Sequence, residues 1–101
     1  MAIYLEWDPE KARKNLRDHG VSFEDAAAVF ADPYRITQED SVVDGELRWR
    51  TIGVALGIVI LLLIHLEEDD GKDLFVRMIS AREATPGEST DYEQARKNDI
   101  G

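Results

Sequence analysis

The sequence predicts an α+β fold in which an antiparallel β-sheet carries helices packed on one face. Two observations support this class. Apolar runs of strand length, separated by turn residues, fill the middle of the chain, and capped helical segments stand near both ends. We expect the element order β-α-α-β-β-β-β-α. The length of 101 residues suits a single domain, residues 1–101.

The chain begins with a short strand and a helix. Residues 3–7 alternate apolar and polar side chains, as a half-buried strand does. Asp8 and Pro9 then predict a helix start, because Asp is a favoured N-cap and Pro suits the first helical position. Gly20 supplies the left-handed residue that follows a helix, so this helix should end near His19.

A second helix is predicted from Ser22 to the Asp-Pro pair at residues 32–33, which stops it. Its Phe23 and Phe30 fall on one face at helical spacing, and we expect both in the core. A last helix should begin at Thr85-Pro86, a second N-cap signature, and run to about residue 98.

Four strands are expected between these helices, at residues 34–41, 46–54, 58–66 and 74–81. The third is continuously apolar and rich in β-branched residues, so it should be a central strand buried on both faces. The apolar stretch 52–66 contains two glycines and is shorter than the roughly 20 residues of a membrane helix. Two strands joined by a turn explain it better.

Composition narrows the possible functions. The net charge is −9, from 12 Lys and Arg against 21 Asp and Glu, which argues against non-specific nucleic-acid binding and favours a basic partner. The absence of cysteine excludes disulfides and a Cys nucleophile, and it fits a reducing, cytoplasmic location. No secretion signal is expected at the N-terminus. The acidic segment 67–72 lacks the ligand spacing of an EF-hand, so we expect a solvated turn there and no metal site.

Two arginines interrupt or close the otherwise apolar strand 74–81. Arg77 lies within the apolar run and Arg82 follows it. A buried unpaired charge is costly, so each guanidinium should either reach an acid or face a groove that receives an anion. The simpler alternative is that Arg77 pairs with a carboxylate and Arg82 is merely exposed.

The hairpin register decides which charged residues meet. A two-residue turn at residues 56–57 would place Arg48 opposite His65. If the following loop keeps Phe75 opposite His65, Arg77 shares that face. The predicted catalytic residues are then Glu46, Arg48, His65, Arg77 and Arg82.

Such a cluster suits an RNA phosphate, because Arg binds phosphate in a bidentate manner. RNA supplies its own nucleophile, the 2′-hydroxyl, so a ribonuclease needs a base, a proton donor and cations around the phosphorus. Glu46 or His65 is a candidate base, and the arginines are candidates for stabilising the charge.

Structural alternatives stand beside each of these roles. His65 also fits a hydrogen-bonded residue at the end of a core strand, and Glu46 with Arg48 fits a same-face ion pair. His19 suits a favourable position at a helix C-terminus better than catalysis. With only two histidines far apart, a His-based metal site has little support.

Several short motifs occur in order along nearly the whole chain, roughly residues 4 to 93. They are Glu6-Trp7-Asp8-Pro9-x-Lys11-Ala12 with Asn15, His19-Gly20-Val21-Ser22-Phe23-Glu24-x-Ala26, Val29-Phe30-x-Asp32-Pro33, Gly45-Glu46-x-Arg48, Ile52-Gly53, Arg77-x-Ile79-Ser80-Ala81-Arg82-x-Ala84-Thr85, Glu88 and Tyr92-Glu93. Together they resemble the BrnT family, ribonuclease toxins of bacterial type II toxin–antitoxin systems.

The resemblance implies a RelE-like α+β fold and a metal-independent endoribonuclease without a cofactor. It also implies neutralisation by a BrnA-like antitoxin, which would read operator DNA when the complex represses its own operon. By position, it carries over Glu46, Arg48, Arg77 and Arg82 as functional residues. The carry-over to His65 rests on a place where relatives often have His or Tyr.

The chain departs from the family pattern in its charge. Relatives are basic after the last Arg, whereas residues 84–91 here contain no positive charge, and residues 67–70 add four acids. Fewer phosphate contacts weaken RNA binding. Besides the predicted catalytic residues, the candidates for binding RNA are Lys11, Lys14, Arg17 and Arg50. The alternative function is a non-catalytic module that binds a basic antitoxin segment by charge complementarity.

Overall fold

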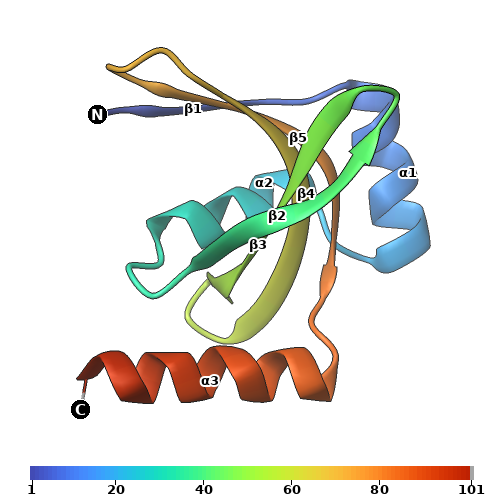
Figure 1. Cartoon of the computed structure of the whole chain (residues 1–101). Coiled ribbons are helices and arrows are strands. Elements are labelled where there is room, and N and C mark those ends of the chain that lie inside the picture. Colours follow the sequence, from blue (N-terminus) through green and yellow to red (C-terminus); the bar gives the residue numbers. More distant parts are fainter. Residues whose placement is uncertain (101) are drawn as a thin grey trace.

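The structure, a computed structural model, describes residues 1–100 and the side chains of residues 1–98. One five-stranded sheet, three α-helices and a 3₁₀ segment make up the fold (Figure 1). In chain order the elements are β1 (Ile3–Glu6), α1 (Pro9–His19), α2 (Phe23–Ala26), η1 (Ala27–Ala31), β2 (Ile36–Val43), β3 (Glu46–Ala55), β4 (Val59–Asp69), β5 (Leu74–Glu83) and α3 (Pro86–Ile100). The predicted α+β class and element order are confirmed, with the second helix tightened into 3₁₀ geometry over its latter half.

The strands lie in the order β1-β5-β4-β3-β2. All neighbours are antiparallel except β1 and β5, which run parallel, so the sheet is mixed. β4 is the central strand and is covered on both faces, since Leu62 is 4% and Leu63 0% exposed. No helix in the described part of the chain has the length and apolar character needed to span a membrane.

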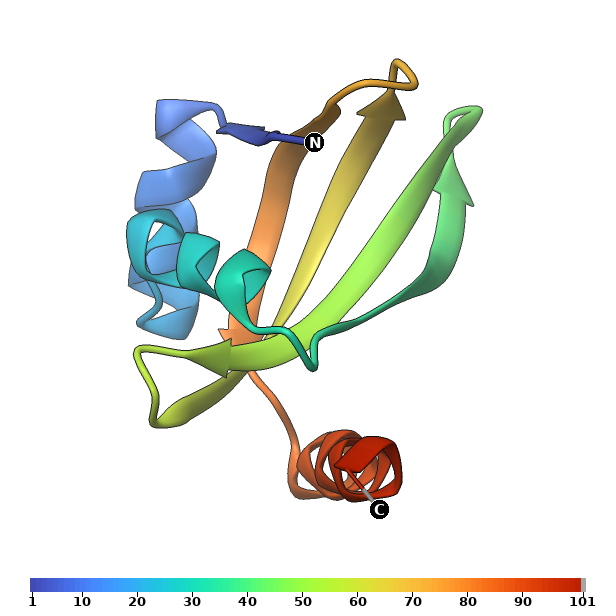
Figure 2. The same ribbon diagram turned by 90° about the vertical axis from the view of Figure 1, so that its left-hand side faces the viewer.

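The main core lies between the sheet and the layer formed by α1, α2 and η1 (Figure 2). Phe23 and Phe30 are buried in it, as predicted. The predicted caps are also present. The Asp8 side chain accepts from the Glu10 amide at 2.9 Å, and Gly20 ends α1 with φ of 72°. The exception to the expected arrangement is α3, which stands apart from the other helices across one end of the sheet.

The predicted hairpin registers are wrong. Three residues, 56–58, separate the paired ends of β3 and β4, because Leu56 and Gly57 both have positive φ and the Ile58 amide closes the turn on Ala55. This extra residue places Trp49 opposite His65. On the other side, the residue opposite His65 is Met78 and not Phe75.

β5 contains a β-bulge at Ile79, the residue that its pairing with β4 skips. Side chains alternate along a strand, so Arg77 and Arg82, five residues apart, would otherwise point to opposite faces. The extra residue reverses the alternation. Both arginines therefore point away from the core, while Met78 and Ala81, 1% and 0% exposed, point into it.

Asn15 secures β5 where the neighbouring strand stops. β1 pairs with β5 only as far as Arg77. Beyond this point the buried Asn15 amide donates to the Ala81 carbonyl at 2.8 Å and accepts from the Ala81 amide at 3.0 Å. It also donates to the Val21 carbonyl at 2.9 Å. One side chain thus replaces the missing strand partner and ties α1 to the sheet.

Asn15→Ala should destabilise the protein by about 3 kcal/mol, because it leaves the buried amide and carbonyl of Ala81 without partners. Urea unfolding followed by tryptophan fluorescence measures this change. Lys14→Ala, on the exposed side of the same helix, is the control and should stay within about 0.5 kcal/mol of wild type. Equal stability of the two variants would contradict the role of Asn15.

Candidate functional site

The face of the sheet opposite α1 and α2 gathers the positive charge of the strands. We call it the arginine face, after the side chains that β3 and β5 direct toward it: Arg48, Arg50, Arg77 and Arg82. The pairing places Arg77 beside Leu66, Arg82 beside Leu62 and Arg50 beside Ile64, alternate residues of β4 that point away from the main core. Alternation along β3 puts Glu46 on the same side. These predicted residues thus point to the same side of the sheet, with Arg48 and Glu46 on the part of β3 beyond its last pair with β4, Trp49–His65.

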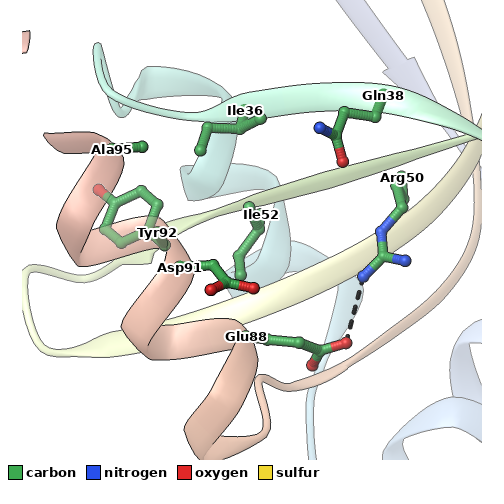
Figure 3. Close-up of a pocket in the computed structure, with 8 residues that line it drawn as sticks. All are labelled: Ile36, Gln38, Arg50, Ile52, Glu88, Asp91, Tyr92 and Ala95. Atoms are coloured by element: carbon green, nitrogen blue, oxygen red, sulfur yellow. Dashed lines mark hydrogen bonds and ion pairs between the residues drawn. The ribbon is translucent and has the colours of Figure 1, made fainter. Parts of the chain in front are cut away.

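Glu88 neutralises two of these arginines. Its carboxylate accepts two hydrogen bonds from Arg82, at 2.8 and 3.0 Å. It accepts another from Arg50 at 3.2 Å (Figure 3). It also accepts from the Thr85 amide and so completes the capping box of α3. The bonds from Arg82 lower the Glu88 pKa to about 2, so the carboxylate is ionised at neutral pH. The cap was predictable from Thr85-x-x-Glu88, but its pairing with Arg82 and Arg50 was not.

A pocket of about 280 Å³ lies beside this cluster, between α3 and the outer side of β2 and β3 (Figure 3). Its lining combines apolar side chains with the Arg50–Glu88 pair: Ile36, Gln38, Arg50, Ile52, Glu88, Asp91, Tyr92 and Ala95. α3 therefore covers the half of the arginine face that contains Arg50 and Arg82. The other half is left uncovered by α3.

Tyr92 anchors α3 to the rest of the fold through Asp32. The buried Asp32 carboxylate accepts from the Tyr92 hydroxyl, and from the amides of Val54 and Tyr34 at 2.8 Å each. Burial alone would raise the Asp32 pKa, but these hydrogen bonds outweigh it and the pKa is lowered. Gly53 permits this arrangement, because a Cβ there would lie 2.9 Å from Val29 and 3.1 Å from the Asp32 carboxylate.

Arg77 and Arg48 lie on the half of the arginine face that α3 leaves open, and they differ in whether they have an acidic partner. Arg77 pairs with Glu6 at 3.2 Å, as the simpler alternative expected, but both side chains are about half or more exposed, 49% and 69%. Such a pair contributes little. Arg48 has no acidic partner within 4.0 Å among the described residues, and its Nε is buried without a hydrogen bond. The ion pair between Glu46 and Arg48, the structural alternative for these two residues, does not form within 4.0 Å.

His65 is not part of this surface. It points into the core, is 0% exposed, and shares a 2.7 Å hydrogen bond between its Nε2 and the Thr51 hydroxyl. Phe30 packs edge-to-face on the ring at 5.4 Å. The prediction that His65 shares a face with Arg48 and Arg77 is therefore wrong. The extra residue in the β3–β4 turn separates it from Arg48, and the pairing of His65 with Met78 separates it from Arg77. The hydrogen-bonded core histidine, the alternative reading of this residue, agrees with the structure.

Burial also sets the protonation state of His65. It lowers the pKa of the imidazole to about 4, so the ring is neutral at physiological pH. The Nδ1 atom lies 3.7 Å from a Glu67 oxygen. Burial raises the pKa of Glu67 above its usual value.

The basic residues of α1 lie along the edge of β5. Lys11 and Lys14 line a pocket of about 230 Å³ together with Ile79 and Ser80, which stand between Arg77 and Arg82 on that strand. Lys14 pairs with Asp18 at 2.5 Å, and Arg17 is 72% exposed. Lys11 and Lys14 thus lie beside β5, the strand that contains Arg77 and Arg82, whereas Arg17 does not line this pocket. Among the described residues, no three His, Asp or Glu side chains gather in a way that could hold a metal ion.

The free energy of unfolding should fall as pH drops from about 6.5 to about 4. The unfolded chain protonates His65 over this range while the folded chain keeps it neutral. The unfolded state then binds more protons, and stability decreases by on the order of 3 kcal/mol. Urea titrations across this range measure the change. His65→Gln should flatten the profile, and His19→Gln should leave it as in wild type. A flat wild-type profile would contradict a buried neutral imidazole.

The family model described as the ribonuclease toxin BrnT of type II toxin–antitoxin systems matches residues 7–88. Among solved structures, the crystal structure of the Brucella abortus ribonuclease toxin BrnT superimposes with a TM-score of 0.54 and 22% identity. The match covers 84% of this chain and 99% of that one, and at this identity it concerns the fold. No curated protein matches. The family match spans most of the chain, and the protein therefore belongs to the BrnT family of ribonuclease toxins of type II toxin–antitoxin systems.

Proposed function

We propose that the protein is a toxin that cleaves RNA on the open half of the arginine face, between Arg48 and Arg77. The observation that carries the proposal is Arg48, which faces this surface without an acidic partner among the described residues. Arg77 is held only by an exposed pair with Glu6, which a phosphate can replace. A chain of net charge −9 that keeps such cations has a local site for an anion.

The proposed reaction uses the 2′-hydroxyl of RNA as nucleophile. Glu46 takes its proton, the 2′-oxygen forms a bond to phosphorus, and the bond to the 5′-oxygen breaks as that oxygen receives a proton from water. The guanidinium groups of Arg48 and Arg77 stabilise the charge on the phosphoryl oxygens. The scheme assigns no role to a metal ion or cofactor. His65 has no part in it, because its ring is buried on the other face.

Arg48→Ala and Arg77→Ala should each lower the rate of RNA cleavage by about 10²-fold, the usual effect of removing a group that stabilises transition-state charge. The matched control is Arg13→Ala, which removes an equal charge from a side chain 66% exposed on α1. Cleavage of cellular RNA and growth arrest on induced expression without antitoxin are the measurements. Wild-type rates in both variants, at equal folded yield, would reject this site.

Membership in a toxin family implies an antitoxin partner, and we propose a BrnA-like protein. The acidic surface favours a basic antitoxin segment, since complementary charge speeds association and selects partners. Contact with DNA would then occur only through the antitoxin in the complex. We place the action of the toxin in the cytoplasm, where its RNA substrate is found.

A second function is favoured by one specific observation, the occupation of Arg82 and Arg50 by Glu88. With half of the arginine face neutralised, the protein would act as a partner-binding module with weak or no nuclease activity. The two functions differ in whether the remaining arginines suffice for RNA binding.

Glu88→Gln separates these possibilities by returning the positive charge of Arg82 and Arg50 to the surface. Its affinity for single-stranded RNA should rise, and the slope of log K against log salt should steepen by about 0.7 for each further phosphate contact. Fluorescence anisotropy over a salt series measures both. Glu93→Gln, exposed on α3, is the control for charge alone. An absence of RNA binding and cleavage in wild type and Glu88→Gln alike would leave the binding module as the function.

A further inference from the structure

Two large aromatic side chains are exposed together at the edge of the arginine face. Tyr4 of β1 is 53% and Phe75 of β5 is 42% exposed. Their rings stack with centroids 5.3 Å apart and an interplanar angle of 18°. A stacked pair that leaves this much ring surface in water is not explained by core packing. Besides stabilising the pairing of the two strands, such a pair can serve as a platform for a further flat ring.

The register places this pair next to Arg77. Tyr4 is paired with Phe75, and Glu6 with Arg77, in the parallel ladder of β1 and β5. Phe75 and Arg77 are two residues apart on one strand, so they share a face and stand roughly 7 Å from each other. The site where we place the phosphate thus has an aromatic surface directly beside it.

The charges around the pair select the part of a nucleotide that fits there. Glu68 is opposite Phe75 on β4, whereas Glu6 is paired with Arg77 and is the group that a phosphate would displace there. The Glu68 carboxylate repels a phosphate group from the aromatic surface. The uncharged base is therefore the portion of RNA that can occupy this surface, while the phosphate stays on Arg77.

We propose that Tyr4 and Phe75 form a stacking site for one base of single-stranded RNA whose neighbouring phosphate lies on Arg77. This inference rests on the proposed function, and it adds the part of the substrate that the strand edge recognises. Stacking tolerates every base, because each has a flat aromatic face. The site therefore holds the RNA in place and contributes little to sequence preference.

The test uses short single-stranded RNAs whose 2′-hydroxyls are all methylated, so that they bind without being cleaved. One base at a time is removed along the strand, and the dissociation constant of each RNA is measured by fluorescence anisotropy. With the wild-type protein, one abasic position should weaken binding by about tenfold. With Phe75→Leu or Tyr4→Leu, which retain apolar bulk but lose the ring, that position should make no difference. Tyr4→Phe should behave as wild type.

Ile58→Ala is the matched control, because Ile58 is an exposed apolar residue (86%) in the β3–β4 turn. It should keep the full penalty for the abasic position. Circular dichroism melts check that each variant is folded. If Phe75→Leu fails to fold, Tyr4→Leu and the quenching of 2-aminopurine placed at the sensitive position in wild type decide the question.

The outcomes separate this inference from the proposed function. If Arg77→Ala slows cleavage by about 10²-fold while Tyr4→Leu and Phe75→Leu bind and cleave as the Ile58→Ala control does, the function stands and the stacking site is rejected. If both aromatic variants lose co-purification with the antitoxin but keep their RNA affinity, the pair is a protein interface and the inference is overturned. If the Arg48 and Arg77 variants cleave at wild-type rates, the proposed function itself fails.

Discussion

The fold depends on β5, which places apolar side chains in the core and arginines on the opposite face. The bulge at Ile79 makes this arrangement possible. The strand must give Met78 and Ala81 to the core and guanidinium groups to the other side. A regular strand cannot do this for two arginines whose positions differ by an odd number, here five. The bulge solves the geometry, and the amide of Asn15 then holds the strand immediately beyond it. The catalytic proposal and the helix packing therefore rely on the same short segment.

The distribution of acids decides which part of the arginine face can bind RNA. The protein is strongly acidic, and its carboxylates are not spread evenly over the arginines. Glu88 is fixed by the capping box of α3 and is ionised at neutral pH, so Arg50 and Arg82 are firmly paired. Arg77, by contrast, forms only a solvent-exposed ion pair with Glu6 at the edge of the sheet. Arg48 and Arg77 are the arginines of this face that Glu88 does not pair, and Arg77 lies two residues from Phe75 of the aromatic pair at the sheet edge.

His65 illustrates how a residue suited to catalysis becomes part of the core. Its Nε2 bonds to Thr51, and the Thr51 hydroxyl in turn lies 2.7 Å from that of Thr37. This short polar chain crosses β2, β3 and β4 and partners the two threonine hydroxyls and the imidazole Nε2, whereas the buried Nδ1 of His65 has no hydrogen-bond partner among the described residues. The imidazole contributes a satisfied hydrogen bond and a packed ring. A neutral, fully buried His has no access to a phosphate on the opposite face.

The sequence by itself determined the element order, the helix caps, the central position of β4 and the family, because these follow from local chemistry and ordered motifs. It also identified Glu46, Arg48, Arg77 and Arg82, which the structure brings to one face, although their roles remain predictions. The tertiary structure alone decided the registers, and with them the exclusion of His65 from that face. A turn longer by one residue, or a single bulged residue, reverses the facing of every side chain beyond it. Neither leaves a distinct pattern in the sequence, since Leu56 adopts its positive φ only within the folded hairpin.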